Sequence, residues 1–430
     1  MKLEWPAEGT RKISAGIAWP ADGGLAIVRV MVLAGLVATP ISTTLDNIIE
    51  FGVYGAILIF PEPRHRVRDV IRHPLVIGML PLAGMILIAT LYGPAAWSDA
   101  LRSLFAWRRI LMLPFAAALF FDDASKRMVL KVLVVTCLLG TLISFATFAT
   151  DFWISKRLDP GIVFHDYAVQ GATFSLAAIG CVAGLVRPEY FAGDRLLGNR
   201  LAMAAILLLL VADVVFILWG RTGAFAIVLM SAVTVVLLIE GSWRTKALAG
   251  LGVVVCGGVI LAASPHVRSR VADGAHEIAE VDQASEGTRF GSRLVYWRNT
   301  TRMIADRPVF GVGTGGFQTA YATYVRGITG WQGNETGDPH NQYLKFQAEQ
   351  GIFGLLAFLF FIYRSFRCPT PQPWRALAAA ALVGWCAISL ASSEFSTHNQ
   401  GRLIFFWLGA MLGGDMLIGR SVGGKSSDTT

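Results

Sequence analysis

The chain of 430 residues is long enough for two or three soluble domains, but its composition excludes that arrangement. Apolar residues make up 54% and charged residues only 15%, and the mean hydropathy is +0.56, so most of the chain requires an apolar solvent. The formal charge of +8 is typical of basic cytoplasmic loops in a membrane protein, and we expect no nucleic-acid partner. These numbers predict an all-α membrane protein that crosses the bilayer many times.

Apolar runs that approach the length of a membrane span recur along the whole chain. A helix needs about 20 mostly apolar residues to cross the hydrocarbon core. We predict about twelve spans, of which the second is the weakest because it is short and contains Glu50. The predicted spans cover residues 24–42, 46–61, 74–92, 103–121, 128–149, 169–186, 200–219, 222–240, 246–264, 350–366, 376–392 and 403–418.

The distribution of positive charge predicts the orientation of these spans. Lys and Arg are about four times as frequent in the segments that would lie inside as in the short outer loops. Both termini are therefore predicted to be cytoplasmic. The chain divides into a membrane part with spans one to nine (1–264), an outer loop (265–349), a membrane part with spans ten to twelve (350–418) and a flexible cytoplasmic tail (419–430).

The outer loop at 265–349 is far longer than an ordinary connection, so we expect it to be functional. Its first part, 271–286, is acidic and weakly patterned. Two amphipathic helices at the membrane surface are predicted from apolar residues at helical spacing. These residues are Leu294, Trp297 and Ile304 in the first helix and Phe317, Tyr321 and Tyr324 in the second.

The segment between these two helices contains a glycine pattern. Gly311, Gly313 and Gly316 spell GxGxxG, which in another context binds dinucleotides. Here neither a βαβ unit nor an acidic residue at the expected distance accompanies the pattern. We therefore predict a tight turn.

Arginines are the most frequent charged residues in and beside the outer loop. Arg221 lies between the seventh and eighth spans, and the junction is so short that these two spans must form a hairpin. The Arg221 side chain either snorkels at the membrane interface or binds an anion. Arg289 and Arg293 are four residues apart and share one helix face. For Arg298, Arg302 and Arg307 we favour contact with solvent or lipid headgroups. The excess of Arg over Lys in the loop favours phosphate recognition.

Two further arginines, Arg108 and Arg109, lie inside the fourth predicted span. A charge in the membrane is costly, so at least one of them is expected to point into the helix bundle. Arg29, near the inner end of the first span, can reach the cytoplasm by snorkelling.

His340 is the candidate base. Asp338 and Pro339 before it fit the N-cap and first position of a helix, and the positive end of that helix would keep the imidazole neutral. A neutral imidazole can accept a proton, although a polar residue that contacts headgroups is the alternative. His398 has the same ambiguity. The five cysteines have no metal-ligand spacing and no P-loop is present, so neither a metal nor another cofactor is expected.

Three segments resemble the signatures of the O-antigen ligase and polymerase superfamily. Gly220–Ala224 (GRTGA) is similar to its arginine signature after a membrane helix. Arg293 and Trp297, followed by 307–313 (RPVFGVG), are similar to its second segment, and 340–344 (HNQYL) with 349–354 (EQGIFG) to its third. The order, the spacing and the placement in a long outer loop agree over about 220–366.

The resemblance implies a C-type glycosyltransferase-like enzyme of the bacterial inner membrane with its active site on the periplasmic face. Such enzymes take a glycan from undecaprenyl pyrophosphate without a nucleotide or a metal. We expect His340 to activate an acceptor hydroxyl and Arg221, Arg293 and Arg289 to bind the pyrophosphate. Supporting roles fall on Asn341, Glu349 and Arg109. The expected partners are the lipid-linked glycan, the lipid A-core acceptor and membrane lipid.

Several readings of the function remain open. An O-antigen ligase is favoured because one outer loop dominates and the chain ends soon after its last span. An O-antigen polymerase or a protein O-oligosaccharyltransferase would share the same site. A twelve-span secondary transporter is the alternative from another class, but such carriers usually show two related halves, and none is visible here.

Overall fold

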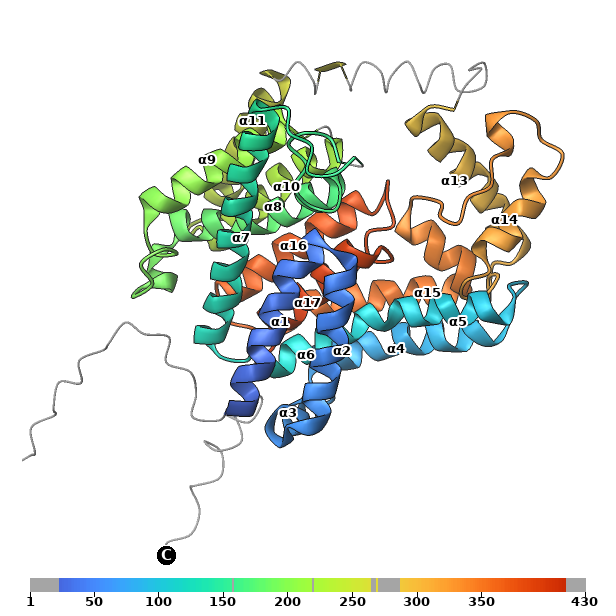
Figure 1. Cartoon of the computed structure of the whole chain (residues 1–430), viewed down its shortest axis with the longest axis horizontal. Coiled ribbons are helices and arrows are strands. Elements are labelled where there is room, and N and C mark those ends of the chain that lie inside the picture. Colours follow the sequence, from blue (N-terminus) through green and yellow to red (C-terminus); the bar gives the residue numbers. More distant parts are fainter. Residues whose placement is uncertain (1–22, 157, 219, 264–267, 270–286, 415–430) are drawn as a thin grey trace, which may run out of the picture.

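The computed structural model describes residues 23–156, 158–218, 220–263, 268–269 and 287–414, and these residues form an all-helical bundle (Figure 1). The first helices are α1 (Gly23–Ile41), α2 (Thr43–Ile59), α3 (Pro61–Val70), α4 (Pro74–Ile88), η1 (Ala89–Leu91), α5 (Trp97–Ala106), η2 (Trp107–Leu111), α6 (Met112–Leu119), α7 (Asp123–Ala149) and α8 (Tyr167–Val186). They are followed by η3 (Pro188–Phe191), α9 (Arg200–Phe216), α10 (Arg221–Leu238), α11 (Trp243–Ala263), α13 (Arg289–Asp306), α14 (Phe317–Val325), η4 (Trp331–Gly333), α15 (Gln342–Phe366), α16 (Trp374–Ile388) and α17 (His398–Leu412). The acidic segment 271–286 and the tail 419–430 lie outside the described residues.

Every one of the twelve predicted ranges contains helix, which confirms an all-α polytopic membrane protein. By length and hydropathy, six described helices can cross a membrane, or seven if α2 and α3, bent by 97° at their junction, form one broken span. The six are α1, α4 with η1, α7, α8, α11 and α15. The remaining predicted spans correspond to shorter helices, including the apolar α10 and α16.

The fourth predicted span, 103–121, is not a single helix. It is divided among α5, the 3-10 helix η2 and α6. Pro114, in the first turn of α6, has no N–H to donate to the carbonyl of Ile110, so the helical ladder is interrupted there. Arg108 and Arg109 lie in the 3-10 segment η2, between the two α-helical parts.

The predicted outer connections meet at one end of the bundle. The backbone N–H of His165 donates to the carbonyl of Pro40 at 2.7 Å, which joins the loop before α8 to the junction of α1 and α2. The N–H of Thr314 donates to the carbonyl of Ala89 at 2.8 Å, which joins the long loop to the end of α4. Each of these contacts places two of the predicted outer connections side by side.

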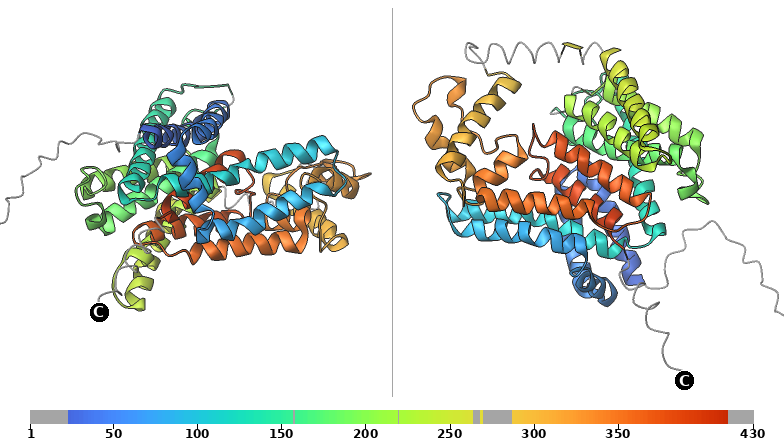
Figure 2. Two further views of the ribbon diagram at one scale, coloured as in Figure 1. Left: turned by 90° about the horizontal axis from the view of Figure 1, so that it is seen from below. Right: turned by 180° about the vertical axis from the view of Figure 1, so that it is seen from behind.

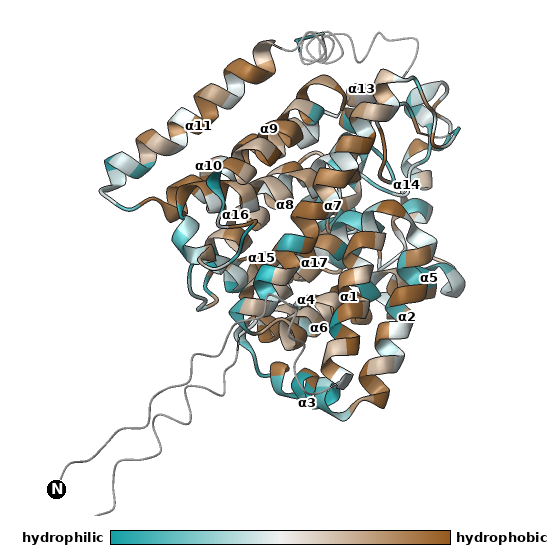
Figure 3. Cartoon of the chain, turned by 60° about the vertical axis from the view of Figure 1, so that its left-hand side comes forward, coloured by the Kyte–Doolittle hydropathy of each residue, from teal (hydrophilic) through white to brown (hydrophobic). Residues whose placement is uncertain are grey.

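The predicted inner connections meet at the other end. Arg29 of α1 forms an ion pair with Asp122 at 2.8 Å, and Lys131 pairs with Asp194 at 2.6 Å. The charged helix α3 belongs to this end, because it directly precedes α4, whose Gly78 packs on Arg364 near the end of α15. Figure 3 shows α3 as hydrophilic, in contrast to the largely hydrophobic α9 and α11.

The two predicted amphipathic helices of the long loop are present as α13 and α14. Met303 of α13 and Phe317 and Tyr321 of α14 form a small core with Val312 and with Ala348 of α15. Figures 1 and 2 show this helix pair at the end of the bundle where α15 begins. The loop is therefore attached to the membrane part by its own hydrophobic core.

The glycine-rich segment between α13 and α14 forms the predicted tight turn, and it is clamped to a kink in α15. Gly351 has φ of +67°, and a Cβ there would lie 2.0 Å from the carbonyl oxygen of Val309. The N–H groups of Val312 and Gly313 donate to the carbonyls of Ala348 and Glu349, both at 2.8 Å. The turn thus pairs with carbonyl groups that the kink releases from the helical ladder.

Replacing Gly351 with Ala is expected to destabilise the protein by at least about 2 kcal/mol, because the left-handed backbone strains any other residue and the new Cβ meets the backbone of Val309. Thermal unfolding in detergent measures this as a lower apparent Tm. Gly84→Ala in α4 is the control, since nothing lies within 4 Å of its Cβ position. Equal Tm values for the two variants would contradict the clamp.

Candidate active site

His340 lies at the predicted outer end of the bundle, but not in a helix. Its φ is +53°, and α15 begins only at Gln342, so the prediction that Asp338 caps a helix with His340 in its first turn is wrong. The backbone N–H of His340 donates to Oδ1 of Asp338 at 2.7 Å, which forms a local turn. The half-buried imidazole stacks near the ring of Tyr296 of α13, with 6.0 Å between the ring centres.

Burial, and not a helix dipole, is the main effect that favours the neutral imidazole of His340. Burial lowers the pKa of His340 below its ordinary value of 6.5. The negative charge of Asp338 opposes this shift, whereas the positive charges of Arg293 and Lys345 add to it. His340 can therefore accept a proton at neutral pH.

Asp338 is a structural carboxylate in this site. Burial alone would raise its pKa, but the adjacent Lys345 and the hydrogen bond from Ser393 lower the pKa below the ordinary value. Its Oδ2 lies 2.8 Å from Nζ of Lys345 in α15, and its Oδ1 accepts from Oγ of Ser393 at 2.6 Å. Asp338 thus joins the His340 turn to α15 and to the connection between α16 and α17.

Asn341 is the N-cap of α15. Its Oδ1 accepts from the N–H groups of Tyr343 and Leu344 at 3.0 and 3.1 Å. Its Nδ2 donates to the carbonyl of Leu390 at 2.9 Å. The structure therefore places the Asn341 amide on backbone groups, where it fixes the point at which the chain leaves His340.

Helix α13 forms the other wall of the site. Trp297 donates from Nε1 to the carbonyl of Pro339 at 2.9 Å, which holds the residue just before His340. Arg293, one turn earlier on α13, is close enough for its charge to lower the pKa of His340. The structure brings together Arg293 and His340, which are 47 positions apart in the sequence.

The side chains of Arg221 and Arg289 lie outside the described residues, so their positions are known from the backbone. Arg289 begins α13, one turn before Arg293. Arg221 begins α10, and its neighbour Gly220 packs closely on the ring of Tyr167 at the start of α8. Both helices thus start at the predicted outer end.

The two remaining supporting residues, Glu349 and Arg109, contact other parts of the outer end. Glu349 is buried beside the glycine-rich turn, and its carboxylate accepts from Nε2 of Gln350 at 3.4 Å. Arg109 is buried and donates to the carbonyls of Ala106, at 2.7 Å, and Ser396. Arg109 therefore supports the connection between α16 and α17, which in turn contacts Asp338.

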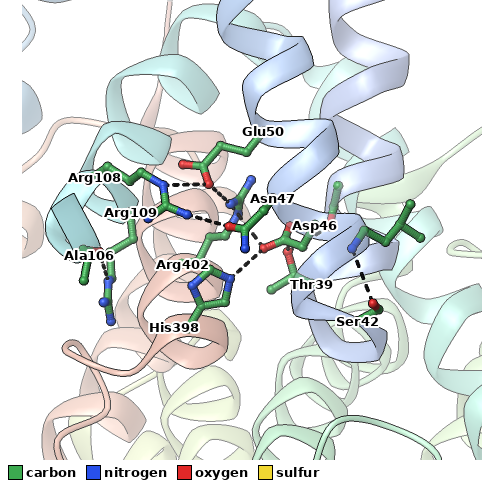
Figure 4. A network of polar contacts seen from close by, with 12 residues as sticks. Thr39, Ser42, Asp46, Asn47, Glu50, Ala106, Arg108, Arg109, His398 and Arg402 are labelled. Carbon is green, nitrogen blue, oxygen red and sulfur yellow. Dashed lines mark hydrogen bonds and ion pairs between the residues drawn. The ribbon is translucent and has the colours of Figure 1, made fainter. Parts of the chain in front are cut away.

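A second group of charges was only partly expected from the sequence. Asp46 and Glu50 of α2 are fully buried, and Arg402 of α17 lies 3.2 and 2.5 Å from their carboxylates. Arg108 pairs with Glu50 at 3.2 Å, and His398 lies 3.2 Å from Asp46 (Figure 4). The prediction that at least one of Arg108 and Arg109 points into the helix bundle is confirmed. Mutual pairing offsets the cost of burying these charges and fixes the start of α17.

Sequence reasoning missed Lys345, Glu394 and Arg402. Lys345 had a signal, because it is the one lysine among the arginines of the long loop. Arg402 was assigned to an outer loop, and no pattern in the sequence links it to Asp46. Within the described residues, no group of three or more His, Cys, Asp or Glu side chains is arranged to hold a metal ion.

Comparison with known proteins identifies a family for part of the chain. Residues 204–359 match the family described as O-antigen ligase, whose members are glycosyltransferase-like enzymes. The matched range contains Arg221, Arg293, His340 and the glycine-rich turn. Among curated proteins, none matches the chain. This matched segment, together with the multi-pass helical fold, supports the O-antigen ligase superfamily for the chain.

Proposed function

We propose that this protein is an O-antigen ligase of the bacterial inner membrane. It transfers a glycan from undecaprenyl pyrophosphate to a sugar hydroxyl of lipid A-core, on the periplasmic face, while both termini are cytoplasmic. The observation that carries the proposal is the meeting of a neutral, half-buried His340 with Arg293 at the end of the bundle where the predicted outer loops gather.

The proposed reaction is a direct displacement with inversion at the sugar. The acceptor hydroxyl oxygen forms a bond to the anomeric carbon while the bond from that carbon to the pyrophosphate oxygen breaks. The electron pair of the broken bond leaves with undecaprenyl pyrophosphate, and the hydroxyl proton passes to the imidazole of His340. The inversion follows because one displacement occurs.

Guanidinium groups stabilise the charge that develops on the departing pyrophosphate. Arg293 and Arg221 bind it in two-pronged fashion, and Arg289 assists from the start of α13. Fixed cations in a half-dry site supply this stabilisation without a metal ion or another cofactor. Asn341, Glu349 and Arg109 act through the backbone that they hold, so they are positioning residues.

Transfer by the reconstituted full-length protein tests this function. The purified chain is placed in liposomes with undecaprenyl-pyrophosphate-linked glycan and a chelator, and it is offered lipid A-core, a second lipid-linked repeat or a pilin-like protein. We expect the glycan on lipid A-core. Product on one of the other acceptors would instead identify a polymerase or a protein O-oligosaccharyltransferase. Transport of the lipid-linked glycan without transfer would overturn the assignment of the protein as a glycosyltransferase.

The same assay tests the protonation state of His340. Because the folded-state pKa of His340 lies below 6.5, its neutral form is retained down to that pKa and is lost only at lower pH. We expect protonation of His340 to cause no loss of kcat/KM as the pH is lowered to about 6.5, and kcat/KM to fall at lower pH. An acid limb centred above pH 6.5 would contradict the assignment of His340 as the buried base.

A further inference from the structure

Glu394 is a buried carboxyl that the proposed reaction does not use. It lies in the connection between α16 and α17 and is 3% exposed. Within the described part of the chain its Oε2 has no hydrogen-bond partner, although Ser392 hydrogen-bonds to the carboxyl. A buried polar atom without a partner is costly, so its retention beside a candidate active site calls for a role.

The surroundings of Glu394 are charged on several sides. Arg293 of α13 contributes positive charge, whereas Asp338 before α15 and Asp166, the N-cap of α8, contribute negative charge. Asp166 and Asp338 are each held by hydrogen bonds to other groups. Arg293 is thus the cation that favours the ionised form of Glu394, and it is the same arginine that acts on His340.

The protonation of Glu394 is finely balanced. Burial raises the pKa of the Glu394 carboxyl to about 7, against the opposing effects of Ser392 and Arg293. A pyrophosphate bound at Arg293 would neutralise this cation and add negative charge nearby. Both changes make the ionised carboxyl less stable.

We infer that Glu394 compensates the charge of Arg293 in the empty site and takes up one proton when a pyrophosphate binds there. The inference rests on the proposed function, because it requires Arg293 to bind the donor. Glu394 is accordingly a positioning residue. It holds the arginine in place before the donor arrives, and it becomes neutral so that it does not repel the pyrophosphate.

Calorimetry on the full-length protein tests the proton uptake by Glu394. The probe is a short polyprenyl pyrophosphate that carries one N-acetylglucosamine; its pyrophosphate is esterified at both ends and has no proton to lose near neutral pH. Binding is measured at pH 8 in two buffers of different ionisation enthalpy, which reports proton uptake directly. Wild type is expected to take up about one proton, and its affinity to fall about tenfold per pH unit above pH 7.

Glu394→Gln mimics the protonated carboxyl. It is expected to take up no proton at pH 8, to bind the probe about tenfold more tightly than wild type at that pH, and to show an affinity that no longer depends on this group. Glu394→Asp keeps a carboxyl group and should retain proton uptake. This variant provides a second measurement if Glu394→Gln does not fold. The matched control is Asp213→Asn in α9, another buried carboxyl with an unpartnered oxygen, whose described neighbours Gln170 and Ser144 are uncharged.

The outcomes separate the inference from the proposed function. Equal proton uptake by wild type and Glu394→Gln, or binding by wild type without proton uptake, would overturn the role inferred for Glu394. Neither result would contradict the assignment of the donor site. Loss of uptake in Asp213→Asn as well would also overturn the role inferred for Glu394, because the effect would then not be specific to this residue. Failure of wild type to bind the probe at any pH would overturn both the donor-site assignment and the proton uptake inferred for Glu394.

Discussion

Replacing His340 with Ala is expected to lower the turnover of glycan transfer by about 10²–10⁴-fold, which is the usual contribution of a positioned general base. Binding of the pyrophosphate-linked donor should be retained, because the arginines remain. Single-turnover transfer in liposomes measures the first effect, and calorimetry with the donor measures the second. A loss of rate without a loss of donor binding separates a base from a residue that only shapes the site.

His165→Ala is the matched control for this experiment. His165 is an exposed histidine at the same end of the bundle, and the contact that it makes with Pro40 uses its backbone. Its replacement should leave transfer unchanged. Transfer by His340→Ala at the wild-type rate would show that another group, or water, accepts the proton.

Replacing Arg293 with Lys is expected to reduce kcat/KM for the donor by about 10²-fold, although the charge is conserved. Lys offers a point charge in place of the planar fork that matches a phosphate. The developing negative charge on the leaving group would then be less well stabilised. The same loss is expected for Arg221→Lys, and initial rates over a range of donor concentrations measure both.

Arg302→Lys on the same helix is the control for Arg293. Its side chain is exposed, in contrast to the half-buried Arg293, and we expect unchanged kinetics. If Arg293→Lys and Arg302→Lys behave alike, then α13 contributes only a general positive field, and specific binding of the pyrophosphate by Arg293 is contradicted.

The hydropathy of the sequence was sufficient to place helices at all twelve predicted ranges, as well as α13 and α14, because lipid or a small local core selects the apolar stripes of those segments. It did not reveal that the fourth span is broken. That result depends on Pro114, which lies in a run otherwise apolar enough to appear continuous. Hydropathy counts apolar residues and is insensitive to a missing N–H.

The candidate site was predictable in its members but not in their connections. Asp338 before Pro339 is a good helix start, but Lys345 and Ser393 occupy its carboxylate, and Asn341 takes the N-cap position instead. Arg402 meets Asp46 and Glu50 only because α17 is oriented so that Arg402 faces these residues of α2. Such long-range choices depend on the packing of the whole bundle, and no local pattern in one sequence records them.

The surroundings of His340 and Glu394 come from α13, from the turn before α15, from the α16–α17 connection and from the start of α8. Asp166 and Glu394, the outermost of these residues in the sequence, are 228 positions apart. An excised 265–349 fragment would lack Ser393, Glu394 and every transmembrane partner that holds them. Screens for inhibitors, or for antibodies that recognise the working enzyme, should therefore use the intact chain in a lipid environment and not a soluble piece of it.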